Sequence, residues 1–189
     1  MTLLNCIAIA DDDSLISKLE PTCDVDVLIC LGDLYDRTIS GAVDHYAPEY
    51  AIGIRGNHCL NGEFPVPVVD LHLKVVTING ITFGGFCGSW QYKKRGNFMF
   101  EQDEVKRLMI DFPAVDVFIA HNSPRLIHER DDNIHQGFDA FIDYIDRTKP
   151  SYFFHGHQHC NQITHRGLTK IVGVYGERQF QIHHPKWIS

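Results

Sequence analysis

Long hydrophobic runs are missing from this 189-residue sequence. No apolar run approaches the ~20 residues that a membrane-spanning helix needs, so we expect no membrane-embedded segment. The apolar stretch 1–10 has no basic residues ahead of it and runs directly into Asp11, Asp12 and Asp13. This pattern favours a first β-strand over a signal peptide.

Paired cysteines are also missing. The six cysteines include no C-x-x-C pair, which argues against a thiolate zinc site. Cys6 and Cys30 lie inside apolar runs, where a cysteine behaves as a small buried hydrophobe. We therefore expect a reducing, cytoplasmic environment and no disulfides.

Positive charge is scarce as well. Lysine and arginine number 17 against 24 acidic residues, which gives a formal net charge of −7. A general nucleic-acid-binding surface needs a basic face, so we do not expect one here. The negative net charge does not exclude a small-molecule phosphoester substrate, because bound divalent metals would make the electrostatic potential at the site positive. The sequence neither predicts nor excludes an oligomer.

The length and the 44% apolar content indicate one folded domain over residues 1–189. Strand-like and helix-like periodicities alternate along the chain, which predicts an α/β (α+β) fold. Asn79-Gly80 between two strand-like runs predicts a β-hairpin. We expect strands near 3–10, 25–31, 50–55, 71–78, 81–86, 115–120, 152–154, 171–175 and 180–182, and helices near 14–20 (ended by Pro21), 101–110 and 138–147.

Histidine, by contrast, is abundant: the chain has 12. A candidate metal ligand also follows each of five separate apolar runs. In an α/β sheet, ligands gather beyond the carboxyl ends of the strands, so we expect these residues to converge. A loop start explains any one of them alone, but five together favour one shared site. The candidates are Asp11, Asp33, Asn57 with its neighbour His58, His121, and His157 with His159.

The local spacing refines these candidates. Alternation along a strand places Asp11 and Asp13 on one side, with Asp12 free to cap the short helix that follows. The i, i+2 spacing of His157 and His159 lets both face one site from an extended segment. Oxygen and imidazole ligands without thiolates favour Mn²⁺, Fe or Zn²⁺. Two such ions, ~3.5–4 Å apart, are the usual machinery for phosphoester hydrolysis. We expect sharp turns at the glycines that precede several candidates, Gly32, Gly56 and Gly156.

Together these motifs resemble the signature of the calcineurin-like metallophosphoesterases, in particular the small bacterial members. The family pattern is D-x-H, GD, GNH, a lone H and GHxH. In this chain it reads Asp11-Asp12-Asp13, Gly32-Asp33, Gly56-Asn57-His58, His121 and Gly156-His157-Gln158-His159. The resemblance implies a four-layer αββα sandwich of two mixed β-sheets flanked by helices. It also places the active site at the C-terminal ends of the strands.

The resemblance further implies two divalent metal ions. Mn²⁺ is favoured, with Fe, Zn²⁺ and Mg²⁺ as alternatives. In the family arrangement, a hydroxide bridging the metals attacks phosphorus, and His58 acts as the general acid. The first metal would be bound by Asp11, Asp13, Asp33 and His159, and the second by Asp33, Asn57, His121 and His157.

The sequence departs from the family pattern at two positions. Asp13 replaces the usual histidine, which shifts the metal preference toward harder ions and weakens the site if the shorter side chain falls short. Cys59 replaces an acidic residue that commonly orients the histidine before it, so support for His58 is in question.

Three further residues are candidate substrate contacts. Arg37 could contact a phosphate or form a structural ion pair with Asp36. His135 could contact the site or cap the helix that follows. Lys93 belongs to a short basic cluster that could contact a phosphate or be a solvated loop.

The function expected from these residues is hydrolysis of phosphodiesters, including nucleotide-type diesters, or of phosphomonoesters. Diesters are favoured because the chain is short and has no cap insertions, which suggests an open site. One alternative is a non-catalytic scaffold on the same fold, motivated by Asp13 and Cys59. Another is a phosphoprotein phosphatase, which the segments 32–37 and 55–58 resemble.

Overall fold

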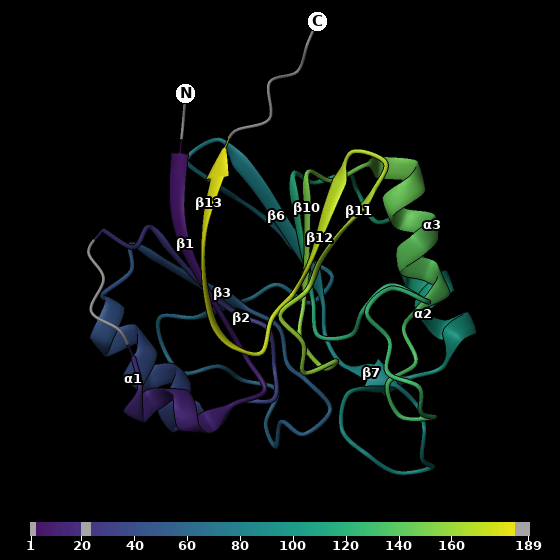
Figure 1. The fold of residues 1–189 in the computed structure, drawn as a ribbon, viewed down its shortest axis with the longest axis horizontal. Coiled ribbons are helices and arrows are strands. Elements are labelled where there is room, and N and C mark those ends of the chain that lie inside the picture. Colours follow the sequence, from purple (N-terminus) through teal and green to yellow (C-terminus); the bar gives the residue numbers. More distant parts are fainter. Residues whose placement is uncertain (1–2, 20–23, 184–189) are drawn as a thin grey trace, which may run out of the picture.

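A computed structural model describes residues 3–19 and 24–183 of the chain and arranges its main strands in two sheets (Figure 1). The first sheet has five strands. β1, β2, β3 and β4 are parallel, and β13 pairs antiparallel with β1 at one edge. The strand order is β13 (Gly176–His183), β1 (Leu3–Ala10), β2 (Val27–Cys30), β3 (Tyr50–Gly53) and β4 (Val69–Asp70).

The second sheet has six strands. Its four central strands are parallel, and an antiparallel strand closes each edge. The strand order is β11 (Ile163–Arg166), β12 (Thr169–Gly173), β10 (Tyr152–His155), β9 (Val117–Ala120), β6 (Ile81–Phe86) and β5 (Val75–Ile78). A small parallel pair, β7 (Ser89–Trp90) and β8 (Met99–Phe100), lies apart from both sheets.

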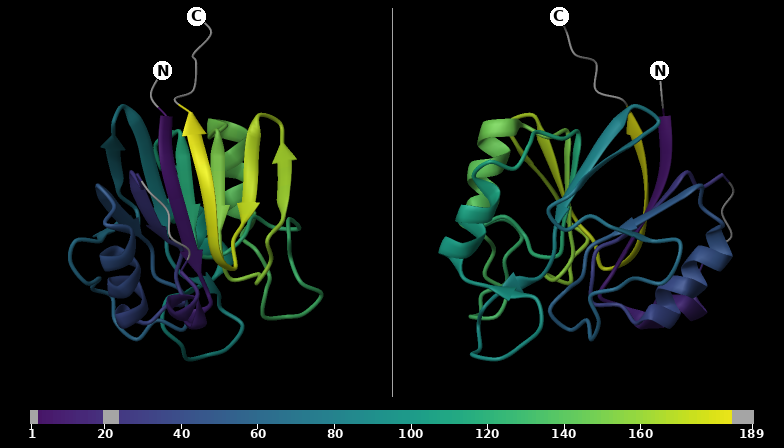
Figure 2. Two further views of the ribbon diagram at one scale, coloured as in Figure 1. Left: turned by 60° about the vertical axis from the view of Figure 1, so that its left-hand side comes forward. Right: turned by 180° about the vertical axis from the view of Figure 1, so that it is seen from behind.

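Helices cover the outer face of each sheet, as the right-hand view in Figure 2 shows. The α1 helix (Asp36–Tyr46) and the short 3₁₀ helix η1 (Asp13–Ser17) pack on the first sheet. The α2 (Gln102–Met109) and α3 (Asp139–Thr148) helices pack on the second sheet. The predicted four-layer αββα sandwich of two mixed sheets is confirmed.

Strand β1 shows how the sequence builds these layers. Its residues alternate, so Cys6 and Ala8 face the second sheet while Ile7 and Ile9 face α1 and η1. Both sides of the strand are therefore apolar, as a buried parallel strand requires. Burying each large aliphatic side chain contributes about 1.5–3 kcal/mol, which makes β1 a rigid base for the aspartates that follow it.

The Asn79-Gly80 hairpin is confirmed. β5 and β6 pair antiparallel with Ile78 opposite Ile81, and both turn residues have positive φ, 48° and 85°. Of the strand expected over 71–78, only 75–78 is a strand. The prediction is wrong for 71–74, which connect β4 in the first sheet to β5 in the second. Leu73, with φ of 54°, lies where the chain crosses between them.

Three smaller differences concern helices and short strands. The α1 helix was not expected from the sequence, and neither was the β7–β8 pair. The helix expected near 14–20 is the 3₁₀ turn η1, and its expected end at Pro21 lies outside the described residues. None of the helices in the described part of the chain is long and apolar enough to span a membrane.

Candidate metal centre

The polar residues predicted at strand ends lie at one end of the sandwich. Asp11, Asp33 and Asn57 follow β1, β2 and β3, which are parallel neighbours in the first sheet. His121 and His157 follow β9 and β10, which are parallel neighbours in the second sheet. The two sheets face each other, so the ligands from both meet across the gap between their carboxyl ends.

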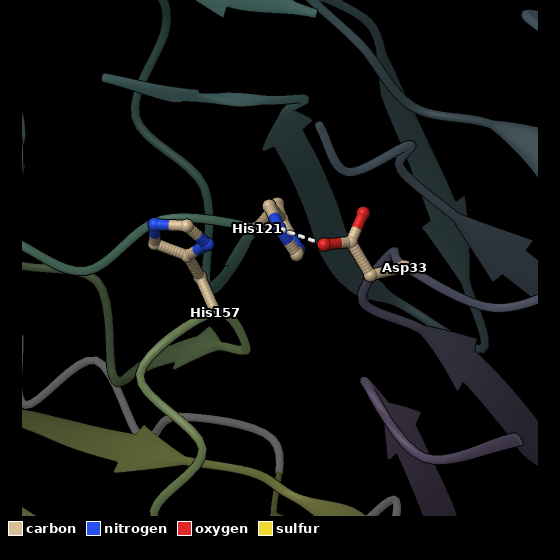
Figure 3. A group of neighbouring side chains, drawn as sticks. All are labelled: Asp33, His121 and His157. Atoms are coloured by element: carbon tan, nitrogen blue, oxygen red, sulfur yellow. Dashed lines mark ion pairs between the residues drawn. The ribbon is translucent and has the colours of Figure 1, made fainter. Parts of the chain in front are cut away.

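Asp33, His121 and His157 form the tightest cluster, shown in Figure 3, with one candidate ligand atom from each lying within 4.8 Å of the others. His121 Nε2 lies 3.2 Å from Asp33 Oδ2 and also 3.2 Å from Asn57 Oδ1. The other three residues expected to share one metal, Asp33, Asn57 and His157, therefore all lie near the His121 ring. A carboxylate, an amide oxygen and two imidazoles form a donor set that suits Mn²⁺, Fe or Zn²⁺.

His121 is fully buried and held by a second contact. Its Nδ1–H donates to the Leu31 carbonyl at 2.8 Å, which directs Nε2 toward Asp33. Although burial opposes a charged ring, the Asp33 carboxylate raises the pKa of His121. Burial likewise opposes the charge on Asp33, but His121 lowers the pKa of that carboxyl. Each group therefore stabilises the charged form of the other.

Asp11 provides the clearest sign that a cation fits. Its side chain is fully buried, and Oδ2 accepts a 2.8 Å hydrogen bond from the His157 backbone N–H. Oδ1 has no hydrogen-bond partner among the described residues and lies 3.8 Å from His159 Nε2. Burial raises the pKa of Asp11 to about 7. A buried carboxylate oxygen without a partner is costly, and a metal ion relieves that cost.

Asp13 is placed differently from Asp11. Its Oδ1 accepts a 2.9 Å hydrogen bond from the Tyr35 N–H and a 2.5 Å bond from the Thr38 hydroxyl. These donors lie at the start of α1, so this oxygen holds the helix in place. Asp12 caps η1 by accepting from the Ser14 N–H, as expected.

The backbone of four candidate ligands is in the left-handed region. The φ angles are 60° at Asp11, 52° at Asp33, 60° at His157 and 47° at His159. Each such residue costs about 1–2 kcal/mol, and such strain concentrates at functional sites. The expectation that His157 and His159 lie on an extended segment is therefore wrong. The turns, and not strand alternation, aim both rings at the cluster.

The glycines beside the ligands allow close approach. A Cβ on Gly56 would lie 2.2 Å from Asp33 Oδ1 and 2.6 Å from His121 Cε1. A Cβ on Gly156 would lie 2.6 Å from Asp11 Oδ2. The expected turns are present too: the Gly56 carbonyl accepts from the Cys59 N–H at 3.2 Å and the Gly156 carbonyl from the Gln158 N–H at 2.6 Å, while Gly32 has φ of 95°. Their missing side chains leave room for the ligands.

The expected general acid, His58, is exposed beside the cluster, and its backbone N–H donates to Asp33 Oδ1 at 2.7 Å. Cys59 is buried, and its Sγ accepts from the Gly56 N–H at 3.2 Å. The thiol therefore stabilises the turn that carries Asn57 and His58.

The three candidate substrate contacts lie in different surroundings. The His135 ring centroid is 4.9 Å from that of His157, and its Nδ1 lies 2.7 Å from an oxygen of Asp132. Arg37 and Lys93 are exposed, and each places its cation over a neighbouring tyrosine ring at 5.0 and 5.1 Å. Only His135 is brought next to the cluster. Asp36 forms its ion pair with Arg55, at 2.9 Å.

Sequence reasoning missed two residues that support the centre. Gln158 lies between the two histidines, and its Nε2 donates to Ser123 Oγ at 2.9 Å and to the His135 carbonyl at 2.7 Å. Tyr175 stacks on His159, with ring centroids 5.1 Å apart. Gln158 could have been predicted as a supporting residue from its position between two predicted ligands, His157 and His159. The Tyr175 contact depends on the path of a distant loop.

The fold and this cluster define an αββα protein with a candidate metal centre. A family model described as calcineurin-like phosphoesterase matches residues 8–161, and the chain belongs to this family. No curated protein matches its sequence.

Solved structures share the fold at low sequence identity. Phosphopantetheinyl hydrolase from Mycobacterium tuberculosis is 12% identical, with a TM-score of 0.65 and 98% of both chains covered. TT1561 of Thermus thermophilus is 14% identical, with a TM-score of 0.60, 93% of this chain and 90% of that one covered. A protein proposed to be a 5′-nucleotidase from Staphylococcus aureus is 11% identical, with a TM-score of 0.58. That comparison covers 98% of this chain and 52% of the other.

Proposed function

We propose that this member of the family is a dinuclear-metal-dependent phosphodiesterase that also accepts phosphomonoesters. The observation that carries the proposal is the buried cluster of Asp33, His121 and His157, with the unpartnered Oδ1 of Asp11 beside it. Charged and imidazole groups at this depth need a function or a counterion, because burial without one is costly.

Asp33 is the residue we assign to both metal ions. Asn57, His121 and His157 would complete one site. Asp11, Asp13 and His159 would complete the other, with Mn²⁺ as the favoured ion. The second site has weaker support than the first, because Asp13 Oδ1 already accepts two hydrogen bonds and His159 is partly exposed.

When bound, the ions would lower the pKa of a water molecule and polarise the phosphoryl oxygens. The protein contributes the positioning. Asp33 is fixed by the His58 N–H and faces His121. The exposed imidazole of His58 would donate its proton to the oxygen that leaves phosphorus, and histidine is the side chain that most often serves as a general acid.

The similar structures are consistent with an organic phosphoester substrate. One is a phosphopantetheinyl hydrolase and another is proposed to be a 5′-nucleotidase. Both are similar in fold only, so they suggest a substrate class by analogy. We favour a small-molecule diester because the chain has no inserted domain over the site in its described part.

The deciding experiment is metal-dependent hydrolysis by metal-stripped protein. Bis(p-nitrophenyl) phosphate would be compared with p-nitrophenyl phosphate, with and without Mn²⁺, beside a His121→Ala control. Mn²⁺-dependent turnover that His121→Ala abolishes would establish the hydrolase, and the ratio of the two substrates would rank diester against monoester. Folded protein that turns over neither substrate with Mn²⁺, Mg²⁺, Zn²⁺ or Fe²⁺ would contradict the proposal.

A non-catalytic scaffold is the second candidate. The placement of Asp13 favours it, since its Oδ1 holds α1 and this weakens the metal site that Asp13 would share with Asp11 and His159. Tight binding of one metal equivalent with no turnover of varied phosphoesters would support this alternative.

A further inference from the structure

A recess of about 170 Å³ opens beside the cluster, between the loop that follows β2 and the loop that follows β3. It is continuous with the proposed active site, because three residues of that site line it. The lining residues used below are Asp13, Asp33, Tyr35, Asp36, Arg55, His58 and Leu60.

Exposed apolar side chains line this recess. Tyr35 is 53% exposed and Leu60 is 79% exposed, and neither belongs to a core cluster of the described residues. The Arg37 guanidinium lies over the Tyr35 ring, 5.0 Å from its centroid. A cation on one face of an aromatic ring leaves the other face for stacking with a ligand.

A buried arginine also lines the recess. Arg55 is 3% exposed, pairs with Asp36, donates to the Glu63 carbonyl and lies over the Phe64 ring. These three contacts hold the guanidinium in place, so Arg55 forms a rigid wall of the recess.

The charge of the recess selects against a second anion. Three carboxylates line it, those of Asp13, Asp33 and Asp36, against the one guanidinium of Arg55. Asp36 and Arg55 neutralise each other, and Asp33 faces His121. The metal ions assigned to Asp13 and Asp33 would be taken up by the phosphate that is hydrolysed. The described residues that line the recess offer no further unpaired lysine or arginine for a second anion, so an uncharged group fits it.

The geometry points to the recess as the subsite for an uncharged aromatic ring in the leaving group. This rests on the proposed function, because His58 lines the recess and is the assigned acid. In the reaction, the P–O bond to the leaving alcohol breaks and that oxygen takes the His58 proton. Phosphorus takes the hydroxide of a water molecule, and the proton released from that water restores His58.

The first test varies the ring. Methyl 2-naphthyl phosphate is compared with methyl phenyl phosphate, together with the matching monoesters, because the two leaving alcohols are similar in acidity. Wild type should prefer the naphthyl ester in kcat/KM by about tenfold, the scale of one stacking contact. Tyr35→Ala and Leu60→Ala should reduce this preference toward one, and Tyr35→Phe should keep it. Leu168→Ala is the matched control, since Leu168 is 82% exposed at a turn outside the recess.

The second test needs no turnover. Binding of 2-naphthylphosphonate and phenylphosphonate to the Mn²⁺-loaded protein is measured by calorimetry, because their C–P bonds are not hydrolysed. An unchanged naphthyl preference in both Tyr35→Ala and Leu60→Ala would overturn the subsite. Tyr35-dependent binding without turnover would instead uphold the subsite and contradict the proposed function.

Discussion

The Thr38 hydroxyl donates a 2.5 Å hydrogen bond to Asp13 Oδ1, which also accepts from the Tyr35 N–H. The position where related enzymes usually carry a histidine ligand therefore connects η1 to the start of α1. A carboxylate near a helix N-terminus is favourable because it meets the positive end of the helix dipole. Asp13 thus has a structural role that is independent of any metal.

Thr38→Val and Asp13→Ala separate the two roles. Thr38→Val removes the hydroxyl with little change of shape and should cost about 1–2 kcal/mol in the free energy of unfolding, measured by urea denaturation. Asp13→Ala should cost at least as much. If Asp13 is also a ligand, Asp13→Ala should bind one Mn²⁺ fewer than wild type, while Thr38→Val keeps both. Equal metal content in the two variants would show that Asp13 is structural only.

Removal of a ligand from the buried cluster should remove a metal. His121→Ala and Asn57→Ala are each expected to retain fewer Mn²⁺ equivalents after dialysis and to lose at least about 100-fold in kcat/KM, since losing even a residue that supports a ligand typically costs ~10–100-fold. Metal analysis of the dialysed protein checks the first effect independently of activity. His165→Ala changes an exposed histidine of β11 and serves as the matched control. Full metal content in His121→Ala would contradict the assigned cluster.

His58 should act on the leaving group without holding a metal. His58→Ala is expected to keep its metal content and to lose about 10²–10⁴-fold in rate on an alkyl ester, which needs a proton on the departing oxygen. Its loss on a p-nitrophenyl ester should be much smaller, because that group leaves as a stable anion. A plot of rate against leaving-group acidity for wild type and variant measures the difference. Equal losses on both esters would rule out the general-acid role.

The strand ends were predictable because each ligand directly follows an apolar run. Once β1, β2 and β3 are parallel neighbours, Asp11, Asp33 and Asn57 must lie at one edge. The hairpin at 79–80 was predictable for a similar reason, since its two residues suit positive φ.

The α1 helix was not predicted, because Ile39, Ala42 and Tyr46 are spaced among polar residues and the apolar stripe is narrow. The left-handed backbone at the ligands could not be predicted either. Aspartate and histidine tolerate positive φ better than most residues, but only the packed loops impose it. The Asp36–Arg55 ion pair was not predicted, because Arg37 is adjacent to Asp36 in the sequence. In the folded chain it is Arg55 that forms the ion pair with Asp36.

Asp11 predicts how the metal-free protein responds to pH. Burial raises the pKa of Asp11 to about 7, so the folded state holds a proton that the unfolded state releases near pH 4. Folding stability from this group is therefore lost as the pH rises from about 4 to about 7, at up to ~1.4 kcal/mol per pH unit.

Two buried histidines, His155 and His157, act in the opposite direction, whereas the raised pKa of His121 adds a loss of stability only above about pH 6.5. Burial lowers the pKa of His155 to about 3 and also lowers that of His157. Below about pH 6.5 these histidines take up protons in the unfolded chain but stay neutral in the folded one, so the free energy of unfolding decreases as the pH falls. The informative quantity is therefore the difference in unfolding free energy between wild type and Asp11→Asn, in which the histidine contributions largely cancel. In the presence of EDTA, the free energy of unfolding of wild type should decrease relative to that of Asp11→Asn as the pH rises from 4.5 to 6.5. Saturating Mn²⁺ should reverse the trend, because metal binding favours the ionised carboxylate. A difference that does not vary with pH in EDTA would show that Asp11 is ionised in the metal-free protein, and the cluster would then carry one more negative charge than assigned here.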